Sequence, residues 1–214
     1  MEILKLTYNP FQENTFIVVD EDKNGVIIDP GAYMPEEKEH LLNTIKEKGI
    51  NLQAILGTHA HLDHILGNSF IKDKFNIDYY LHKEDVAVLE AGERSAELYG
   101  FNNYIPSPHP DKFLEDGQIL NFGKIELKVI FTPGHAPGHV VFYIEKENVV
   151  INGDVLFAGS YGRVDLPGGD FNQLYDSITK KMFELPDDTV VHTGHGPSTT
   201  IGREKKSNPI LMGA

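Results

Sequence analysis

Histidine and aspartate crowd into one short segment of this sequence. Residues 59–64 are His-Ala-His-Leu-Asp-His, so three imidazoles and one carboxylate lie within six residues. Imidazole nitrogen and carboxylate oxygen are ligands that suit zinc and similar divalent ions. His59 and His61, two residues apart, can point the same way from an extended segment, whereas the adjacent Asp63 and His64 are expected to face a second point. The segment therefore predicts ligands for two metal ions.

Four ligands from one loop do not complete two metal sites, so further donors must come from elsewhere in the chain. His135 follows a rigid Thr-Pro-Gly turn, Asp154 follows a glycine and could bridge two ions, and His195 lies between two glycines that permit close backbone approach. We expect Asp63 and Asp154 to be the catalytic carboxylates as well. The predicted metal ligands are His59, His61, Asp63, His64, His135, Asp154 and His195.

Two further side chains are expected to contact a substrate. His139 follows His135 by four residues, close enough either to reach the cavity or to support a ligand from behind. Tyr161 belongs to a set of aromatic residues that could line an apolar substrate wall, although filling of the core is the commoner role of such residues. The set is Tyr99, Phe101, Tyr104 and Tyr161.

The elements that must position these donors follow from hydrophobic patterning. His59, His135, Asp154 and His195 each come just after a predicted strand. Because strand ends at one edge of a sheet bring distant residues together, this placement predicts convergence, and the mixture of elements predicts an α+β fold. Strands are predicted over 3–7, 14–20, 26–29, 52–56, 78–81, 118–122, 125–131, 140–145, 149–152 and 189–192, helices over 36–48, 65–74, 84–91 and 171–182, and loops over 102–110 and 159–169.

Composition limits the classes of function. The chain has 214 residues, 40% hydrophobic and 24% charged, which favours one soluble domain over residues 1–214. It has no cysteine, so disulfides and thiolate chemistry are excluded. A net charge of −13 argues against a nucleic-acid partner. No stretch is typical of an export signal or a membrane span, so we expect a cytoplasmic protein with no membrane partner. The oligomeric state is left open.

These motifs resemble the metallo-β-lactamase superfamily, in particular its glyoxalase II (hydroxyacylglutathione hydrolase) branch. The match in order, spacing and flanking glycines extends from the Asp-Pro-Gly at 29–31 to Gly196. It is closest to short, single-domain bacterial members of that branch. The supporting segments are 64–68 (His-Ile-Leu-Gly-Asn), 132–135 (Thr-Pro-Gly-His), 153–157 (Gly-Asp-Val-Leu-Phe), 159–170 and 194–204.

The resemblance implies a four-layer αββα sandwich with the site at one edge. It also implies a division of the ligands between two metals, with His59, His61 and His135 on the first, Asp63, His64 and His195 on the second, and Asp154 bridging. Arg163 stands where the family has a basic residue that contacts a glutathione carboxylate, so it joins the predicted substrate-binding residues. We expect a domain without the C-terminal helical region that helps glyoxalase II bind glutathione, and Asp165 stands where the family has a tyrosine. Both departures argue against glutathione recognition.

The expected function is hydrolysis of an activated carbonyl, most of all a small-molecule acyl-thioester, by a hydroxide that bridges two divalent metals. Zinc is expected, and iron or manganese would also suit the ligands. The alternatives are a persulfide dioxygenase with a single iron, a lactone or β-lactam hydrolase, and a non-catalytic scaffold stabilised by metal.

Overall fold

The computed structural model describes residues 1–212. The chain forms two compact units: unit 1 comprises Met1–Leu114 and Asn121–Ile125, and unit 2 comprises Glu115–Leu120 and the chain from Glu126 onward. The predicted α+β class is confirmed, because the described residues contain two six-stranded sheets together with helices. The expectation of one domain stays a prediction. Among residues 1–212, no helix combines the length and the apolar character needed to cross a membrane.

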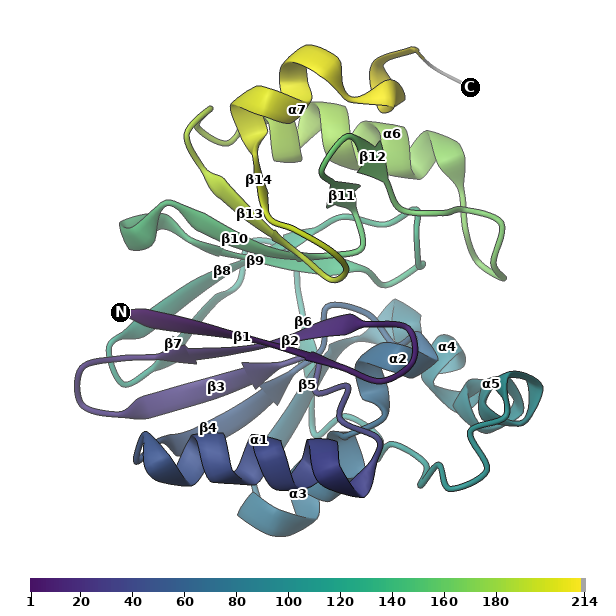
Figure 1. Cartoon of the computed structure of the whole chain (residues 1–214). Coiled ribbons are helices and arrows are strands. Elements are labelled where there is room, and N and C mark those ends of the chain that lie inside the picture. Colours follow the sequence, from purple (N-terminus) through teal and green to yellow (C-terminus); the bar gives the residue numbers. More distant parts are fainter. Residues whose placement is uncertain (213–214) are drawn as a thin grey trace. The chain divides into compact units, whose positions relative to one another are not determined.

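The sheet of unit 1 has the strand order β1-β2-β3-β4-β5-β6 (Figure 1). β1 to β3 are antiparallel neighbours, and β3 to β6 run parallel. The central parallel strands β3 and β4 contain the buried apolar runs 26–28 and 54–56, as expected of strands buried on both faces. Helix α1 packs Leu41 and Ile45 against this sheet. The elements are β1 (Glu2–Tyr8), β2 (Glu13–Val19), β3 (Asn24–Ile28), α1 (Pro35–Glu47), β4 (Asn51–Leu56), α2 (Leu62–Ile65), α3 (Asn68–Phe75), β5 (Asp78–His82), η1 (Lys83–Asp85), α4 (Val86–Glu90), α5 (Gly92–Tyr99) and β6 (Lys112–Leu114).

The second sheet has the order β14-β13-β10-β9-β8-β7, and its strand β7 crosses the boundary between the units. β10 and β13 are parallel neighbours. Helices α6 and α7 lie along one face of this sheet (Figure 1), where Leu174, Ile178 and Ile201 enter the core. The elements are β7 (Ile119–Phe122), β8 (Ile125–Phe131), β9 (Val140–Ile144), η2 (Glu145–Glu147), β10 (Val149–Gly153), β11 (Leu156–Phe157), β12 (Ser160–Tyr161), α6 (Phe171–Lys180), η3 (Met182–Glu184), β13 (Val190–Thr193), β14 (Thr199–Thr200), α7 (Ile201–Ser207) and η4 (Pro209–Met212).

The predicted helix over 65–74 was wrong at its start, because the structure has two helices there, α2 and α3, separated at Gly67. The backbone N–H of Gly67 donates a 2.7 Å hydrogen bond to the carbonyl oxygen of Pro30, and a Cβ at this position would lie 2.7 Å from the same oxygen. The close approach of another backbone therefore interrupts the helix where glycine allows it. The predicted loop over 159–169 also begins with a short strand, β12.

Candidate metal centre

The first group of donors follows two neighbouring parallel strands of unit 1. Asp29 comes directly after β3, and the loop from Gly57 to His61 comes directly after β4. Asp29 is buried and takes a left-handed backbone conformation (φ 49°). Its carboxylate accepts hydrogen bonds from the backbone N–H of Thr58 at 2.7 Å and from the Thr58 hydroxyl at 2.5 Å. The two strand ends are thereby locked together at the start of the histidine segment.

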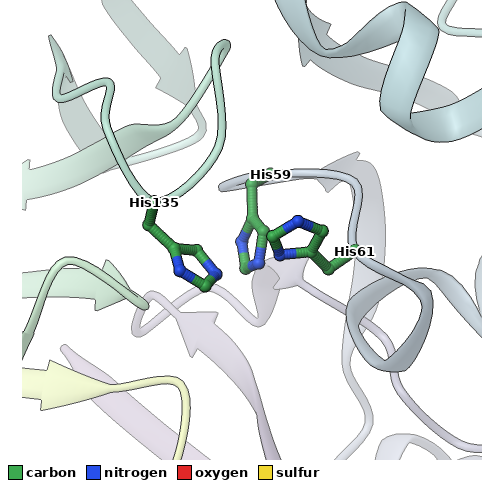
Figure 2. A group of neighbouring side chains, drawn as sticks. All are labelled: His59, His61 and His135. Atoms are coloured by element: carbon green, nitrogen blue, oxygen red, sulfur yellow. The ribbon is translucent and has the colours of Figure 1, made fainter. Parts of the chain in front are cut away.

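All four predicted ligands of the histidine segment lie close together in unit 1. The rings of His59 and His61 are edge to face with centroids 4.8 Å apart (Figure 2), and the centroids of His59 and His64 are 4.1 Å apart. Asp63 lies in the first turn of α2, and one of its carboxylate oxygens is 3.5 Å from Nε2 of His64. His61 precedes α2 in an extended conformation, so the segment changes direction there. The two pairs of predicted ligands lie on either side of this transition, His59 and His61 before α2 and Asp63 and His64 within it.

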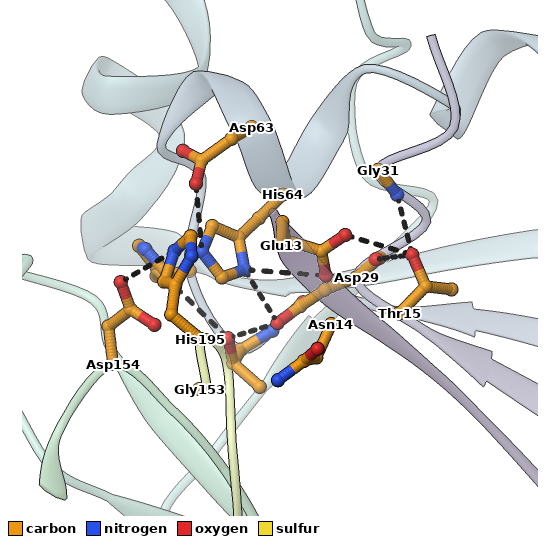
Figure 3. Close-up of polar contacts among 12 residues, drawn as sticks. Glu13, Asn14, Thr15, Asp29, Gly31, Asp63, His64, Gly153, Asp154 and His195 are labelled. Carbon is orange, nitrogen blue, oxygen red and sulfur yellow. Dashed lines mark hydrogen bonds and ion pairs between the residues drawn. The ribbon is translucent and has the colours of Figure 1, made fainter. Parts of the chain in front are cut away.

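Two buried carboxyl groups face Nδ1 of His64 from behind. Oδ2 of Asp29 lies 3.1 Å from this nitrogen and Oε1 of Glu13 lies 4.0 Å from it (Figure 3). Glu13 also accepts a hydrogen bond from the Thr15 hydroxyl at 2.9 Å. Burial raises the pKa of Glu13 well above its usual range, while the nearby His64 opposes this shift. An acidic partner on Nδ1 is the usual support for a histidine that binds metal through Nε2.

Asp29 and Glu13 are functional residues that sequence reasoning missed as members of the site. The ligand atoms of Asp29, His59 and His64 all lie within 4.8 Å of one another. Because both carboxylate oxygens of Asp29 already accept hydrogen bonds or face His64, we assign it to supporting the histidines and not to binding metal. The Asp-Pro-Gly motif was the available sequence signal for Asp29, whereas Glu13 has no comparable spacing around it.

The second group of donors follows the strands of unit 2. His135 lies after β8, Asp154 directly after β10, and His195 after β13. The backbone N–H of Gly194 donates to the carbonyl oxygen of Gly153 at 2.7 Å, which holds the ends of the parallel strands β10 and β13 together. As a result, Oδ2 of Asp154 lies 3.4 Å from Nε2 of His195 (Figure 3) and 3.6 Å from Nε2 of His135.

These distances are suited to ligands of a shared metal. Two ligands bound tetrahedrally at about 2.0–2.1 Å from a zinc ion lie roughly 3.3–3.4 Å from each other. One oxygen of Asp154 meets that separation, within a few tenths of an ångström, to each of two imidazoles. Nδ1 of His135 is 2.7 Å from the carbonyl oxygen of Arg163, so it carries the proton and Nε2 presents its lone pair. The donor set therefore fits a divalent metal ion, with one oxygen of Asp154 near both imidazoles.

His139 is fully buried behind Asp154. Its Nε2 accepts a 3.1 Å hydrogen bond from the backbone N–H of Asp154, and its Nδ1 lies 3.4 Å from the hydroxyl oxygen of Thr132. The ring is thus neutral, with its proton on Nδ1. Of the two roles that the sequence left open, this geometry favours support of the neighbouring ligand, and substrate contact by His139 remains an untested prediction.

Replacement of His139 tests this supporting role. His139→Leu removes the acceptor for the Asp154 N–H, and supporting residues of this kind change metal affinity by roughly 10- to 100-fold. We expect that loss in the leucine variant and partial recovery in His139→Gln, whose side-chain oxygen can accept the same hydrogen bond. Competition with a chromogenic chelator measures the affinity. A leucine variant that binds metal as tightly as the unaltered protein would contradict the assignment.

The other predicted substrate contacts lie on and after the hairpin of β11 and β12. The Arg163 guanidinium donates two hydrogen bonds to Asp165, at 2.7 and 2.6 Å, and both side chains are exposed. Hydrogen bonding from Arg163 lowers the pKa of Asp165 to about 2. Asp165, which stands where the family has a tyrosine, thus pairs with Arg163, the residue predicted to bind a substrate carboxylate. Tyr161 is half-buried and packs edge to face against Phe171. The substrate contacts of Arg163 and Tyr161 stay predictions.

Known proteins resemble this chain over almost its entire length. Hydroxyacylglutathione hydrolase GloC of Haemophilus influenzae is 38% identical over 213 residues, which cover 99% of this chain and 97% of the relative. Among solved structures, BLEG-1 B3 metallo-beta-lactamase has a TM-score of 0.90 and 40% identity, covering 99% of this chain and 100% of that one. TTHA1623 in a di-iron-bound form has a TM-score of 0.88 and 39% identity, covering 97% and 100%.

The model of the metallo-beta-lactamase superfamily matches residues 8–195, a span that includes both groups of donors. The match confirms the predicted family, and the similarity to GloC fits the glyoxalase II-like branch. With its two sheets, helices and histidine-rich donor groups, the chain belongs to the metallo-beta-lactamase superfamily and is a metallo-hydrolase with that fold.

Proposed function

We propose that this chain is a thioesterase whose two groups of donors together hold two divalent metal ions. His59, His61 and His135 would hold the first ion, Asp63, His64 and His195 would hold the second, and Asp154 would contribute its carboxylate to both. The observation that carries the proposal is the position of Asp154, with one oxygen 3.4 and 3.6 Å from Nε2 of two imidazoles. The family match, which spans both groups, supports their joint use.

The proposed reaction follows from the chemistry that a pair of metal ions held by these imidazole and carboxylate groups would supply. With divalent ions held there, the site would supply hydroxide near pH 7 for attack on a carbonyl carbon. The protein keeps two of these imidazoles in the tautomer that presents Nε2: Nδ1 of His135 donates to the Arg163 carbonyl oxygen, and Nδ1 of His64 donates to the Asp29 carboxylate. Asp154 and Asp63 contribute the negative charge that divalent ions require.

A thioester is the favoured substrate class for two reasons. The similarity to hydroxyacylglutathione hydrolase GloC, at 38% identity, supports hydrolysis of an acyl-thiol. A thiolate also leaves without a strong general acid, because the conjugate thiol has a pKa of about 8.5. Zinc, a small-molecule acyl-thioester and a cytoplasmic location belong to this proposal. The di-iron form of the similar TTHA1623 supports iron as the alternative to zinc.

Hydrolysis of a β-lactam is the second candidate. The observation that favours it is the similarity to BLEG-1 B3 metallo-beta-lactamase, with 40% identity and a TM-score of 0.90. The same hydroxide would attack the lactam carbonyl, but the leaving amide nitrogen needs a proton that a thiolate does not need. The donor groups alone therefore suit the thioester better.

Metal quantification combined with a substrate panel tests the proposal. We expect protein purified without added metal to contain two divalent ions per chain and to hydrolyse acyl-thioesters, S-lactoylglutathione among them, faster than a chromogenic β-lactam. Faster turnover of the β-lactam would favour the second candidate. A single iron per chain with oxygen uptake on a persulfide would overturn the hydrolase proposal in favour of a dioxygenase.

A further inference from the structure

The hairpin of β11 and β12 packs directly on two of the proposed metal ligands of unit 2. The backbone carbonyl oxygen of Arg163, two residues beyond β12, accepts a 2.7 Å hydrogen bond from Nδ1 of His135. Gly162 lies so close to both ligands that a Cβ at this position would be 2.0 Å from the carbonyl oxygen of Asp154 and 3.1 Å from Nδ1 of His135. A displaced hairpin would therefore change the hydrogen bond that orients the His135 ring.

The hairpin is too short to hold itself in place. β11 and β12 form two residue pairs, Leu156 with Tyr161 and Phe157 with Ser160. An isolated two-stranded hairpin is marginally stable at best in water. At the base of the hairpin, the fully buried side chain of Asn152 donates to the carbonyl oxygen of Leu156 at 2.8 Å and accepts from its N–H at 3.3 Å. The tip of the hairpin needs an anchor of its own.

Glu204, a fully buried residue of α7, anchors the tip. Its Oε2 accepts hydrogen bonds from the backbone N–H of Gly159 at 2.9 Å and from the side-chain amide of Asn208 at 2.8 Å, and its Oε1 accepts one from the Thr199 hydroxyl at 2.5 Å. Burying a carboxylate costs free energy unless its oxygens are hydrogen-bonded, and here both are. The Asn208 amide also donates at 2.8 Å to the carbonyl oxygen of Ser160, where β12 packs against η4 (Figure 1). Glu204 and Asn208 therefore fix the hairpin tip to α7 and its C-terminal end.

We propose that Glu204 is a positioning residue of the proposed metal centre. By holding the hairpin tip, it keeps the Arg163 carbonyl oxygen against Nδ1 of His135, so that Nε2 of this ring stays presented beside Asp154. This inference rests on the proposed function, in which His135 and Asp154 hold metal. Replacement of a purely structural Glu204 would lower only the stability of the fold, whereas a positioning Glu204 also controls the mobility of the His135 ring in protein that remains folded.

The Nδ1 proton of His135 reports the position of the hairpin independently of activity. Proton–nitrogen correlation NMR of the full chain observes this ring proton, and the loss of its signal in His135→Gln assigns it. Glu204→Met preserves most of the side-chain volume and removes the acceptors. Because loss of a hydrogen bond to a charged group shifts a local equilibrium by roughly tenfold or more, we expect this proton to exchange with water at least about tenfold faster in the methionine variant. Glu204→Gln retains an oxygen that can accept from Gly159, so the exchange rate should return close to that of the unaltered protein.

Zinc affinity, measured by competition with a chromogenic chelator, is the second readout. We expect Glu204→Met to bind zinc roughly 10- to 100-fold more weakly, the scale for residues that orient metal ligands, and Glu204→Gln to recover most of this loss. Ile45→Ala is the control for lost stability. Ile45 is buried in the last turn of α1 and its carbonyl oxygen accepts from the N–H of Ile50, just before β4, whereas the histidine segment follows the other end of β4. The control should lower Tm and leave proton exchange and zinc affinity unchanged.

Thermal unfolding checks that each variant is folded at the temperature of measurement. Asn208→Ala, which removes the donor to Ser160 of the hairpin, replaces Glu204→Met should the methionine variant not fold, with the same expected direction of change. If Tm falls while proton exchange and zinc affinity match those of the unaltered protein, Glu204 is only structural, and the inference is overturned while the metal centre stands. If proton exchange depends on Glu204 but the unaltered protein binds no metal, the proposed function fails and the positioning of His135 stands.

Discussion

Removal of the bound metal with a chelator is expected to lower thioester hydrolysis by at least about a thousandfold. The expectation follows from the proposed donor set, since the proposal assigns seven imidazole and carboxylate groups to metal and none of the proposed chemistry uses a covalent nucleophile. Activity should return when zinc is added back to the dialysed protein. Parallel additions of iron and manganese rank the metals by the activity that each restores.

The same treatment should lower thermal stability, which provides a control that does not depend on the assay. A ligand present at 100 to 1,000 times its dissociation constant stabilises the folded state by about 2.7–4.1 kcal/mol. For a chain of this size, each kcal/mol corresponds to roughly 2–4 °C in Tm. Chelation should therefore lower Tm by several degrees, with circular dichroism confirming that the protein stays folded at the assay temperature. Full activity in protein shown to contain no metal would refute the mechanism.

The grouping of these donors was predictable from the types of residue and their positions in the chain. Three histidines and an aspartate within six residues rarely occur without a metal, and each remaining donor follows a strand. In the structure, His59, Asp154 and His195 do lie just beyond β4, β10 and β13. The strands of four or more residues were predictable because apolar runs bounded by turns give a strong periodic signal, whereas the shorter strands β6, β11, β12 and β14 were missed.

The supporting residues were not predictable in the same way. Glu13 is an ordinary acidic residue in the sequence, and only its complete burial, 4.0 Å from Nδ1 of His64, gives it a role. Helices α5 and α7 are 8 and 7 residues long, too short for a clear helical period, and they were missed.

Asp154→Asn is expected to lower kcat/KM for thioesters by roughly 10²- to 10³-fold, the scale of losing a group that stabilises the reacting centre. The substitution keeps the size of the side chain and removes its negative charge. A single oxygen of Asp154 lies 3.4 Å from Nε2 of His195 and 3.6 Å from Nε2 of His135. Its negative charge would therefore contribute to metal binding beside both imidazoles. The amide is a much weaker ligand, so we expect fewer than two metal ions per chain in the variant, measured by elemental analysis.

Asp176→Asn is the matched control for this substitution. Asp176 lies on α6 of the same unit, with 55% of its side chain exposed, and pairs with Lys180 one helical turn away. Exposed pairs of this kind contribute at most about 1 kcal/mol to stability, so metal content and activity should both be unchanged. If Asp154→Asn keeps two metals and full activity, Asp154 does not bridge. If it keeps two metals but loses activity, the carboxylate acts in the reaction itself and not in holding the metal pair, because loss of a bridging ligand must first appear in the metal content.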